Sequence, residues 1–307
     1  MNIIITGGTG LVGSRLSLIL TNAGHKVSHL SRHENLRAIY PAYAWDVNKQ
    51  WLSPAAIEAI KQVDGIIHLA GAGIADGRWT ESRKKELLSS RIDSAKLLHD
   101  TFAEHQLQPK VFLSASAVGY YGDTGETLCT ETSPAAPDTD FMAYICRRWE
   151  ESVQSISAMG IRTATIRIGI VLSTQGGALA KMLPSYTLRT GAYFGSGEQY
   201  YSWIHLDDLC RMFEFLLENP ETSGIYNGVS PQPVSNYRLA EAIAEAKDIK
   251  ALLMPVPAFA LRFAMGDMSA VVLAGSKVSA DKISAAGFVF KQPDLVPALK
   301  DLLANNI

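Results

Sequence analysis

Three glycines near the amino terminus have the spacing of a phosphate-binding turn. Gly7, Gly10 and Gly13 form a G-x-x-G-x-x-G pattern between an apolar run at 3–5 and a helical pattern that begins at Ser14. In such a turn one glycine allows the tight bend, a second lets the backbone approach a pyrophosphate, and a third lets the helix pack against the strand. Free amides at the start of the helix then hold the phosphates, whereas a tight turn without a ligand is the alternative. The residues predicted to bind a dinucleotide here are Gly7, Gly10, Leu11, Val12 and Gly13.

The residues that follow the second predicted strand, 26–30, decide between NAD and NADP. NAD enzymes usually place an Asp or Glu there, which binds the ribose 2′-hydroxyl. This chain has Ser31 and Arg32 instead. A guanidinium can contact a 2′-phosphate through two hydrogen bonds, and no carboxylate at this position repels that phosphate. We predict that Ser31 and Arg32 hold NADP(H), and a solvated Arg32 beside Glu34 is the alternative.

The strand predicted at 65–70 runs into small residues, Gly71-Ala72-Gly73. Small residues at the carboxyl end of a strand let a dinucleotide lie across it. We therefore expect Leu69 and Ala70 to line the path of the cofactor towards its nicotinamide. His68, in the same strand, is expected to be a buried strand residue rather than a catalyst.

Polar residues lie at the end of the strand predicted at 110–116. Ser116 closes this strand, and Tyr120 and Tyr121 follow it closely. Polar groups at the carboxyl ends of parallel strands lie where ligands bind in such sheets. These three residues are therefore candidate catalytic groups, and the walls of a pocket are the alternative role for the two tyrosines.

A helical region that opens at Arg78-Trp79-Thr80 carries polar residues on its first turns. Glu86, Ser90 and Arg91 lie within about a turn and a half of one another. We expect Glu86 and Arg91 to lie near the nicotinamide end of the cofactor. A surface salt bridge is the alternative role for Arg91.

The composition excludes several classes of protein. The chain has 307 residues with a formal net charge of −2, so it implies neither a nucleic acid nor an anionic membrane as partner. Cys129, Cys146 and Cys210 are few and far apart, which fits reduced thiols in a cytoplasm, and no spacing suggests a metal site. No apolar run is long enough to span a bilayer. The first strand starts at residue 2, which leaves no room for a secretion signal.

Strands that alternate with helices predict an α/β fold with a Rossmann-type, doubly wound parallel sheet. We expect an NADP-binding domain at 1–170 with a return segment at about 203–228, and a small, mostly helical substrate domain at 171–307. Segment 255–273 is rich in Ala, Phe, Met and Leu, and is expected to be core of this small domain. A flexible apolar wall over a ligand is the alternative for that segment. Further predicted strands are 43–46, 162–168 and 224–227, and the predicted helices include 14–23, 54–62 and 141–158.

Several motifs together resemble a known family. The chain carries TGGTGLVG at 6–13, HLAG at 68–71, SASAVGYYG at 114–122 and WIHLDD at 203–208, a combination similar to an extended short-chain dehydrogenase/reductase. Within that superfamily the chain resembles the atypical, epimerase-like branch of NAD-dependent epimerases and dehydratases, the YfcH-type proteins. The resemblance implies an NADP-type Rossmann domain followed by a small C-terminal substrate domain. Other marks of the branch are RWT at 78–80, SR at 90–91, GGA at 176–178, GSGEQ at 195–199, SWIH at 202–205 and GFVF at 287–290.

The catalytic pattern that this resemblance implies is incomplete. The superfamily transfers hydride with a Ser or Thr, a Tyr, and a Lys four residues further on that lowers the pKa of the Tyr. Ser116 matches the serine. Relatives carry an acidic residue eleven positions before the Tyr and a Glu eight after it, and Glu131 and Glu150 take those places around Met142. The Lys position then falls on Cys146, and neither a thioether nor a thiol can replace the missing pair.

Other residues are candidates to replace the missing pair. Tyr144 and Arg148 lie one helical turn apart, but a shift of two residues rotates a helix by about 200°, so Tyr144 should face away from the serine. Tyr120 or Tyr121 is a better replacement acid, because both are close to the serine in sequence. Arg91 lies where the superfamily usually has an Asn, and it could take over part of the cofactor contact of the missing Lys.

Two functions remain open. The first is an NADP(H)-dependent oxidoreductase or epimerase that acts on a small polar substrate, with a nucleotide sugar as one candidate, through an altered proton relay. The second is a non-catalytic NADP(H)-binding sensor or regulatory protein linked to cell division, a label that some relatives carry. The substrate pocket is expected between the catalytic candidates and Trp203 with the small domain. A homodimer is one expectation, because many relatives pair through Rossmann helices and 142–150 is by position part of one.

Overall fold

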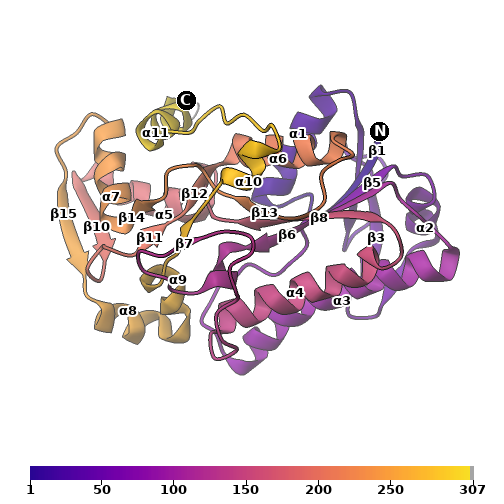
Figure 1. The fold of residues 1–307 in the computed structure, drawn as a ribbon, viewed down its shortest axis with the longest axis horizontal. Coiled ribbons are helices and arrows are strands. Elements are labelled where there is room, and N and C mark those ends of the chain that lie inside the picture. Colours follow the sequence, from indigo (N-terminus) through magenta and orange to yellow (C-terminus); the bar gives the residue numbers. More distant parts are fainter. Residues whose placement is uncertain (305–307) are drawn as a thin grey trace.

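An eight-stranded sheet forms the centre of the computed structural model, which describes residues 1–304 (Figure 1). All neighbouring strands are parallel except β3 and β4, so the predicted doubly wound parallel sheet is confirmed. The short strand β4 has no counterpart among the predicted strands. In spatial order the strands are β13 (Gly224–Gly228), β8 (Arg162–Ile168), β6 (Val111–Ala117), β5 (Gly65–His68), β1 (Asn2–Thr6), β2 (Lys26–Ser31), β3 (Ala42–Asp46) and β4 (Trp51–Leu52).

The strand order reverses between β1 and β5. From β1 the chain proceeds to β2 and β3 on one side, and it then returns to β5, β6 and β8 on the other. Ligands bind to open parallel sheets at the carboxyl ends of the strands, at such a switch point. The glycine turn follows β1, and Leu69 and Ala70 follow β5, so these predicted binding residues lie at the switch point.

Helices cover both faces of the sheet. α1 (Leu11–Asn22) packs against α6 (Leu206–Glu218) on one face, and α3 (Glu81–His105) packs against α4 (Phe141–Ser157) on the other (Figure 1). The predicted helix at 14–23 therefore begins three residues earlier, directly after the glycine turn. The apolar run of β1 is completely buried, because the strand is covered on both faces.

A second, smaller unit is drawn on the left of Figure 1. It contains paired strands as well as helices, with β10 parallel to β15. Its elements are α5 (Gly177–Thr187), β10 (Thr190–Phe194), β11 (Tyr200–Tyr201), β14 (Val234–Ser235), α7 (Asn236–Ala246), β15 (Leu252–Val256), α8 (Ala258–Met265), the 3-10 helix η2 (Gly266–Ser269), α9 (Ala270–Leu273) and α11 (Leu295–Ala304). The remaining elements are α2 (Pro54–Ile60), the 3-10 helix η1 (Val118–Tyr121), β7 (Leu128–Cys129), β9 (Ile170–Leu172), β12 (Trp203–His205), β16 (Lys277–Val278) and α10 (Asp281–Ala285).

Trp203 belongs to the core of this second unit. Its side chain is 0% exposed and packs in one cluster with Tyr186, Leu239 and Leu299. Its indole Nε1 donates a 2.9 Å hydrogen bond to the Gln232 carbonyl oxygen. The expectation that Trp203 lines the substrate pocket is therefore wrong, because no surface of the side chain remains available to a ligand.

Segment 255–273 is not the core element that its composition indicates. Within α8 only Leu261 is buried, whereas Phe259 is 74% and Phe263 is 86% exposed. The expectation of a core segment is thus wrong for α8, because its two phenylalanine side chains are exposed to solvent. Across residues 1–304 no helix has both the length and the apolar character needed to cross a bilayer.

Candidate functional site

The glycine turn brings free amides to the switch point. Gly7 has a φ of +71°, a conformation that favours glycine, and its carbonyl accepts a 3.0 Å hydrogen bond from Gly10 N. A Cβ at Gly13 would collide with that same carbonyl, so glycine is needed for α1 to approach the turn this closely. Within the described residues no side chain caps α1. The amides of its first turn, which include those of Leu11 and Val12, are therefore available to an anion.

Thr6 joins the ends of β1 and β5. Its Oγ1 accepts hydrogen bonds of 3.1 Å from both Leu69 N and Ala70 N. A Cβ at Gly7 would lie 2.9 Å from the Leu69 carbonyl carbon and oxygen, so the two strand ends are in close contact. The structure thus brings the predicted residues of the turn and of the β5 end together.

His68 is a buried strand residue, as predicted. Thr6 Oγ1 already accepts two amide hydrogens, so its own proton is donated to His68 Nδ1, 2.8 Å away. His68 Nε2 then carries the remaining proton, which points to Ser94 Oγ at 3.1 Å. Burial lowers the pKa of His68 to about 4, so the neutral imidazole is the form that this network accommodates.

Ser31 and Arg32 lie at the carboxyl end of β2, the neighbour of β1 in the sheet. Ser31 is half-buried and Arg32 is exposed. Among residues 1–304, the Arg32 guanidinium forms no hydrogen bond or ion pair. Glu34, its expected neighbour, instead accepts a 3.3 Å hydrogen bond from Ser53 Oγ. The Arg32 guanidinium is therefore free to bind a ligand.

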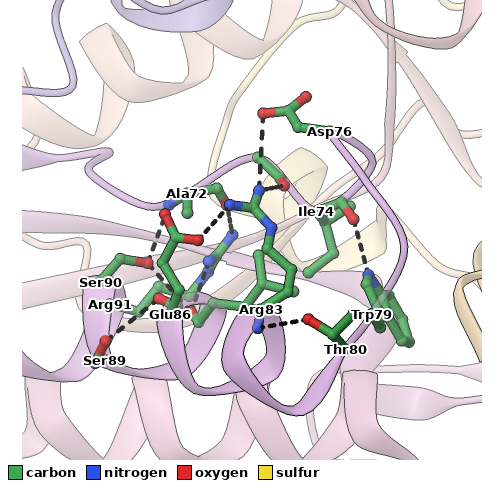
Figure 2. A network of polar contacts seen from close by, with 12 residues as sticks. Ala72, Ile74, Asp76, Trp79, Thr80, Arg83, Glu86, Ser89, Ser90 and Arg91 are labelled. Carbon is green, nitrogen blue, oxygen red and sulfur yellow. Dashed lines mark hydrogen bonds and ion pairs between the residues drawn. The ribbon is translucent and has the colours of Figure 1, made fainter.

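Arg91 reaches from α3 to the loop that follows β5 (Figure 2). Its Nη2 donates to the Ala72 carbonyl at 3.1 Å and its Nη1 to the Leu87 carbonyl at 2.9 Å, while Ala72 N donates to Ser90 Oγ at 3.0 Å. The guanidinium carbon lies 5.0 Å from the centre of the Trp149 ring on α4. Burial lowers the pKa of Arg91, and within the described part of the chain no carboxylate pairs with it. The expectation of a surface salt bridge is thus wrong.

Glu86 lies beside the same loop but is exposed to solvent. It forms a 2.6 Å ion pair with Arg83 Nη1. Arg83 also donates a hydrogen bond to the Gly73 carbonyl, and Trp79 Nε1 donates to the Ile74 carbonyl at 2.9 Å (Figure 2). These side chains fix the loop, and Glu86 acts on it only through Arg83.

Ser116 donates a hydrogen bond to the carboxylate of a buried ion pair. Its Oγ lies 2.7 Å from Glu150 Oε1 on α4. Arg167 of β8 donates two hydrogen bonds to the same carboxylate, from Nε and Nη2, each at 2.8 Å. All three side chains are almost inaccessible to solvent. The predicted catalytic serine therefore holds the strand end and α4 together.

The two tyrosines of η1 occupy different environments. Tyr121 is buried, donates to Asn227 Oδ1 at 2.7 Å and accepts from Arg167 Nη1 at 2.9 Å. Burial raises the pKa of Tyr121 to about 12. The Tyr120 ring lies 3.4 Å from the Arg167 guanidinium carbon, yet its hydroxyl is engaged by no residue in 1–304. Of the two, only Tyr120 offers a hydroxyl for proton exchange.

Met142 and Cys146 lie against η1. A Cβ at Gly119 would be 3.1 Å from Met142 Cε and 3.8 Å from Cys146 Sγ, so both side chains face the end of β6. Burial raises the pKa of the Cys146 thiol to about 12. Arg148 points elsewhere, since it pairs with an acidic residue on the exposed side of α4, and the Tyr144 ring lies 5.8 Å from the guanidinium carbon of Arg147. Neither residue therefore supplies the proton relay that a Tyr and a Lys would provide at the positions of Met142 and Cys146.

Arg167 was missed among the site residues predicted from the sequence. A signal existed, because Arg167 is an ionisable residue between Ile166 and Ile168, near the carboxyl end of strand 162–168. A charge buried in a central strand requires a partner. Its partners come from α4, η1 and the loop after β7, and no local sequence pattern connects these three segments.

A cavity of about 460 Å³ opens beyond η1, between the loop at 122–126 and the second unit. A neighbouring cavity of about 510 Å³ shares Glu126, Ser196, Glu198 and Tyr200 with it. The residues that line the first cavity are Asp123, Gly125, Glu126, Phe194, Gly195, Ser196, Glu198, Gln199, Tyr200, Ala258, Arg262 and Leu273.

The parallel sheet, the glycine turn at its switch point and the cavity-bearing second unit define a dinucleotide-binding protein of the Rossmann type. Residues 3–228 match the model of the NAD dependent epimerase/dehydratase family, and residues 256–302 match a domain of unknown function, DUF1731. The sequence is 39% identical to the "Epimerase family protein YfhF" of Bacillus subtilis (strain 168) over 307 residues, 99% of each chain. The chain therefore belongs to the NAD dependent epimerase/dehydratase family.

Solved structures resemble this chain over its whole length. The human epimerase family protein SDR39U1 (isoform2), solved with NADPH, has a TM-score of 0.87 and 30% sequence identity over 100% of both chains. The nucleoside-diphosphate sugar epimerase from Corynebacterium glutamicum has a TM-score of 0.77 and 30% identity, over 98% of this chain and 58% of the other.

Proposed function

We propose that this protein binds NADP(H) at the switch point and reduces or epimerises a small polar substrate, for which the cavity beyond η1 is the candidate pocket. The observation that carries the proposal is the free Arg32 guanidinium beside the glycine turn, with no acidic residue at the position that selects NAD. The amides of Leu11, Val12 and Gly13 would hold the pyrophosphate, and Ser31 and Arg32 would hold the 2′-phosphate. The similar human protein was solved with NADPH, which supports this choice.

The proposed proton relay differs from that of the superfamily. When bound, NADPH supplies a hydride to a carbonyl carbon. Tyr120 would donate the accompanying proton, because its hydroxyl has no hydrogen-bond partner in residues 1–304, whereas the hydroxyl of Tyr121 donates to Asn227. Ser116 would act as a positioning residue, since its proton is committed to Glu150.

In other members of the superfamily the Lys places a positive charge beside the cofactor. Arg91 would provide part of that positive charge in this chain. Its guanidinium lies against the ring of Trp149 on α4. Cys146, which takes the position of that Lys, lies on the same helix. A buried cation without a carboxylate partner is costly, and an anionic or polar group of the cofactor would offset that cost. The backbone of Leu69 and Ala70 would then lie beside the nicotinamide end of the cofactor, together with the loop that Arg83 and Arg91 hold in place.

The charge of the cavity favours a substrate without phosphate groups. Asp123, Glu126 and Glu198 line it together with a single Arg262, and Lys277 offsets Glu126 from 3.7 Å. A nucleoside diphosphate would add negative charge to this surface, whereas carboxylates readily accept hydrogen bonds from hydroxyl or ammonium groups. A nucleotide sugar, which the name of the Corynebacterium neighbour suggests, is the second candidate.

A non-catalytic NADP(H) sensor linked to cell division is the second candidate function. The observation that favours it is the replacement of the Tyr and Lys by Met142 and Cys146, which face η1 in the buried site. Placement in the YfcH-type branch, a cytoplasmic location and a homodimer through α4 remain part of the proposal, and no nucleic acid or membrane partner is proposed.

The test is a titration of the protein with NADPH and with NADH. NADPH should bind at least about tenfold more tightly, a preference of about 1.4 kcal/mol. Arg32→Ala should remove most of that preference and leave NADH binding unchanged. Arg37→Ala is the matched control, because Arg37 is also exposed on the same segment and its side chain has no partner within residues 1–304. Equal binding of both cofactors to the wild type would contradict the NADP(H) assignment.

A further inference from the structure

The N-terminal unit holds α8 and η2 of the second unit through two basic side chains. Arg78 Nε donates a 2.9 Å hydrogen bond to the Ala264 carbonyl, and its Nη2 donates to the Phe263 carbonyl. Lys84 Nζ, near the start of α3, forms a 2.8 Å ion pair with Asp267 Oδ2 of η2. These contacts join elements that lie about 180 residues apart in the sequence.

Arg78 completes the carboxyl end of α8. The last four carbonyls of a helix have no partner within the helix, and two of those in α8 are satisfied by Arg78. A cation at this end also interacts favourably with the helix dipole. The end of α8 is therefore satisfied by a residue of the other unit.

The helix has little packing of its own to fix its position. Leu261 is its one buried residue within the described chain, and Phe259 and Phe263 project into solvent. Segments with few buried apolar contacts open at low free-energy cost. The polar contacts of Arg78 and Lys84 therefore have a large share in placing α8.

The inner face of α8 lines the cavity. Ala258 and Arg262 are four residues apart, on one face of the helix, and both belong to the lining. Any movement of α8 would therefore move the Arg262 guanidinium, which is the cationic group among the residues that line this cavity. The position of α8 thus decides the shape and charge of the cavity.

The loop that leads to Arg78 is tied to the proposed cofactor site at its other end. Thr6 holds the amides of Leu69 and Ala70, and Arg91 holds the Ala72 carbonyl. Arg83 of α3 donates to the Gly73 carbonyl, and Trp79, which directly follows Arg78, donates to the Ile74 carbonyl (Figure 2). Hydrogen bonds thus fix the loop at several points between the end of β1 and Arg78, whose guanidinium in turn contacts the end of α8.

We propose that Arg78 and Lys84 are positioning residues that couple occupation of the cofactor site to closure of α8 over the cavity. This inference rests on the proposed function, because the cofactor must lie against the loop at 69–74 for the coupling to exist. A cofactor that orders this loop strengthens the hold of Arg78 on α8. By reciprocity, a ligand that closes α8 over the cavity tightens cofactor binding.

The experiment is hydrogen–deuterium exchange of the full chain with and without saturating NADPH. In the wild type, NADPH should protect the glycine turn and also slow exchange in α8 by about fivefold, the low end of couplings between sites. In Arg78→Ala/Lys84→Ala the turn should remain protected and the effect on α8 should vanish. Lys85→Ala is the matched control, because Lys85 is exposed beside Lys84 and has no side-chain partner in residues 1–304.

Each outcome decides the proposal. Unchanged exchange in wild-type α8 with a protected turn overturns the coupling and leaves the proposed function intact. Equal protection of α8 in the double variant overturns the role of the two residues. No protection of the turn in the wild type removes the proposed function and the coupling together. If the double variant fails to fold, Arg78→Lys replaces it, and that single substitution, which retains the charge and one hydrogen bond, should give an intermediate effect.

Discussion

The Arg167 guanidinium and the Glu150 carboxylate form a doubly hydrogen-bonded ion pair, with both contacts at 2.8 Å, in the interior between β8 and α4. Removing one partner of a buried pair leaves an uncompensated charge, which costs far more than the pair itself contributes. Ser116, Tyr121 and the ring of Tyr120 all contact this pair. The pair therefore organises the end of β6 where the catalytic candidates lie.

The first prediction concerns the stability of this cluster. Arg167→Met and Glu150→Gln should each lower the free energy of unfolding by about 3 kcal/mol, because each leaves a buried polar partner unpaired. The double variant should lose less than the sum of the two, since no lone charge remains. Ser116→Ala should cost only about 1 kcal/mol, because Arg167 still satisfies the carboxylate. Urea denaturation measures all four, and strictly additive losses would contradict the pairing.

The second prediction separates the two tyrosines. Tyr120→Phe should lower NADPH-dependent turnover of a carbonyl substrate by about 100-fold or more and leave the free energy of unfolding nearly unchanged. Tyr121→Phe should instead destabilise the fold by about 1–2 kcal/mol, because Asn227 and Arg167 lose a buried partner. A panel of small carbonyl compounds supplies the assay. If the wild type oxidises NADPH with none of them, the sensor function is favoured over the enzyme.

The third prediction concerns Arg91. Arg91→Ala should weaken NADPH binding by about tenfold and reduce its dependence on salt concentration, because a cation near the cofactor is lost. Ser90→Ala is the control, since it removes a hydrogen bond to the same Ala72 without changing the charge. Unchanged affinity in Arg91→Ala would show that Arg91 only clamps the loop.

The glycine turn and the parallel sheet could be predicted because their signals are local. A strand, three spaced glycines and a helix are adjacent in the sequence, and strands alternating with helices determine the architecture. The assignment of Met142 and Cys146 to the Tyr and Lys positions also followed from the flanking Glu131 and Glu150, and in the structure both side chains lie close to Gly119 of η1.

The contacts within the site could not be predicted in the same way. Ser116, Glu150 and Arg167 lie on different elements, and only their packing shows that the serine proton is committed to a carboxylate. The exposure of α8 was missed for a related reason. An apolar composition indicates that a helix has a face to bury, and it does not indicate whether a partner surface exists.

The last prediction concerns pH and His68. Burial lowers its pKa to about 4 in the folded protein, against 6.5 for an ordinary histidine. Between these values the unfolded chain binds more protons, so the free energy of unfolding should fall as the pH drops from 6.5 to 4, by about 3 kcal/mol in total. His68→Gln keeps a donor and an acceptor and should abolish this part of the pH dependence. His33→Gln removes an exposed histidine and should retain the wild-type profile, so identical profiles for the two variants would contradict the assignment to His68.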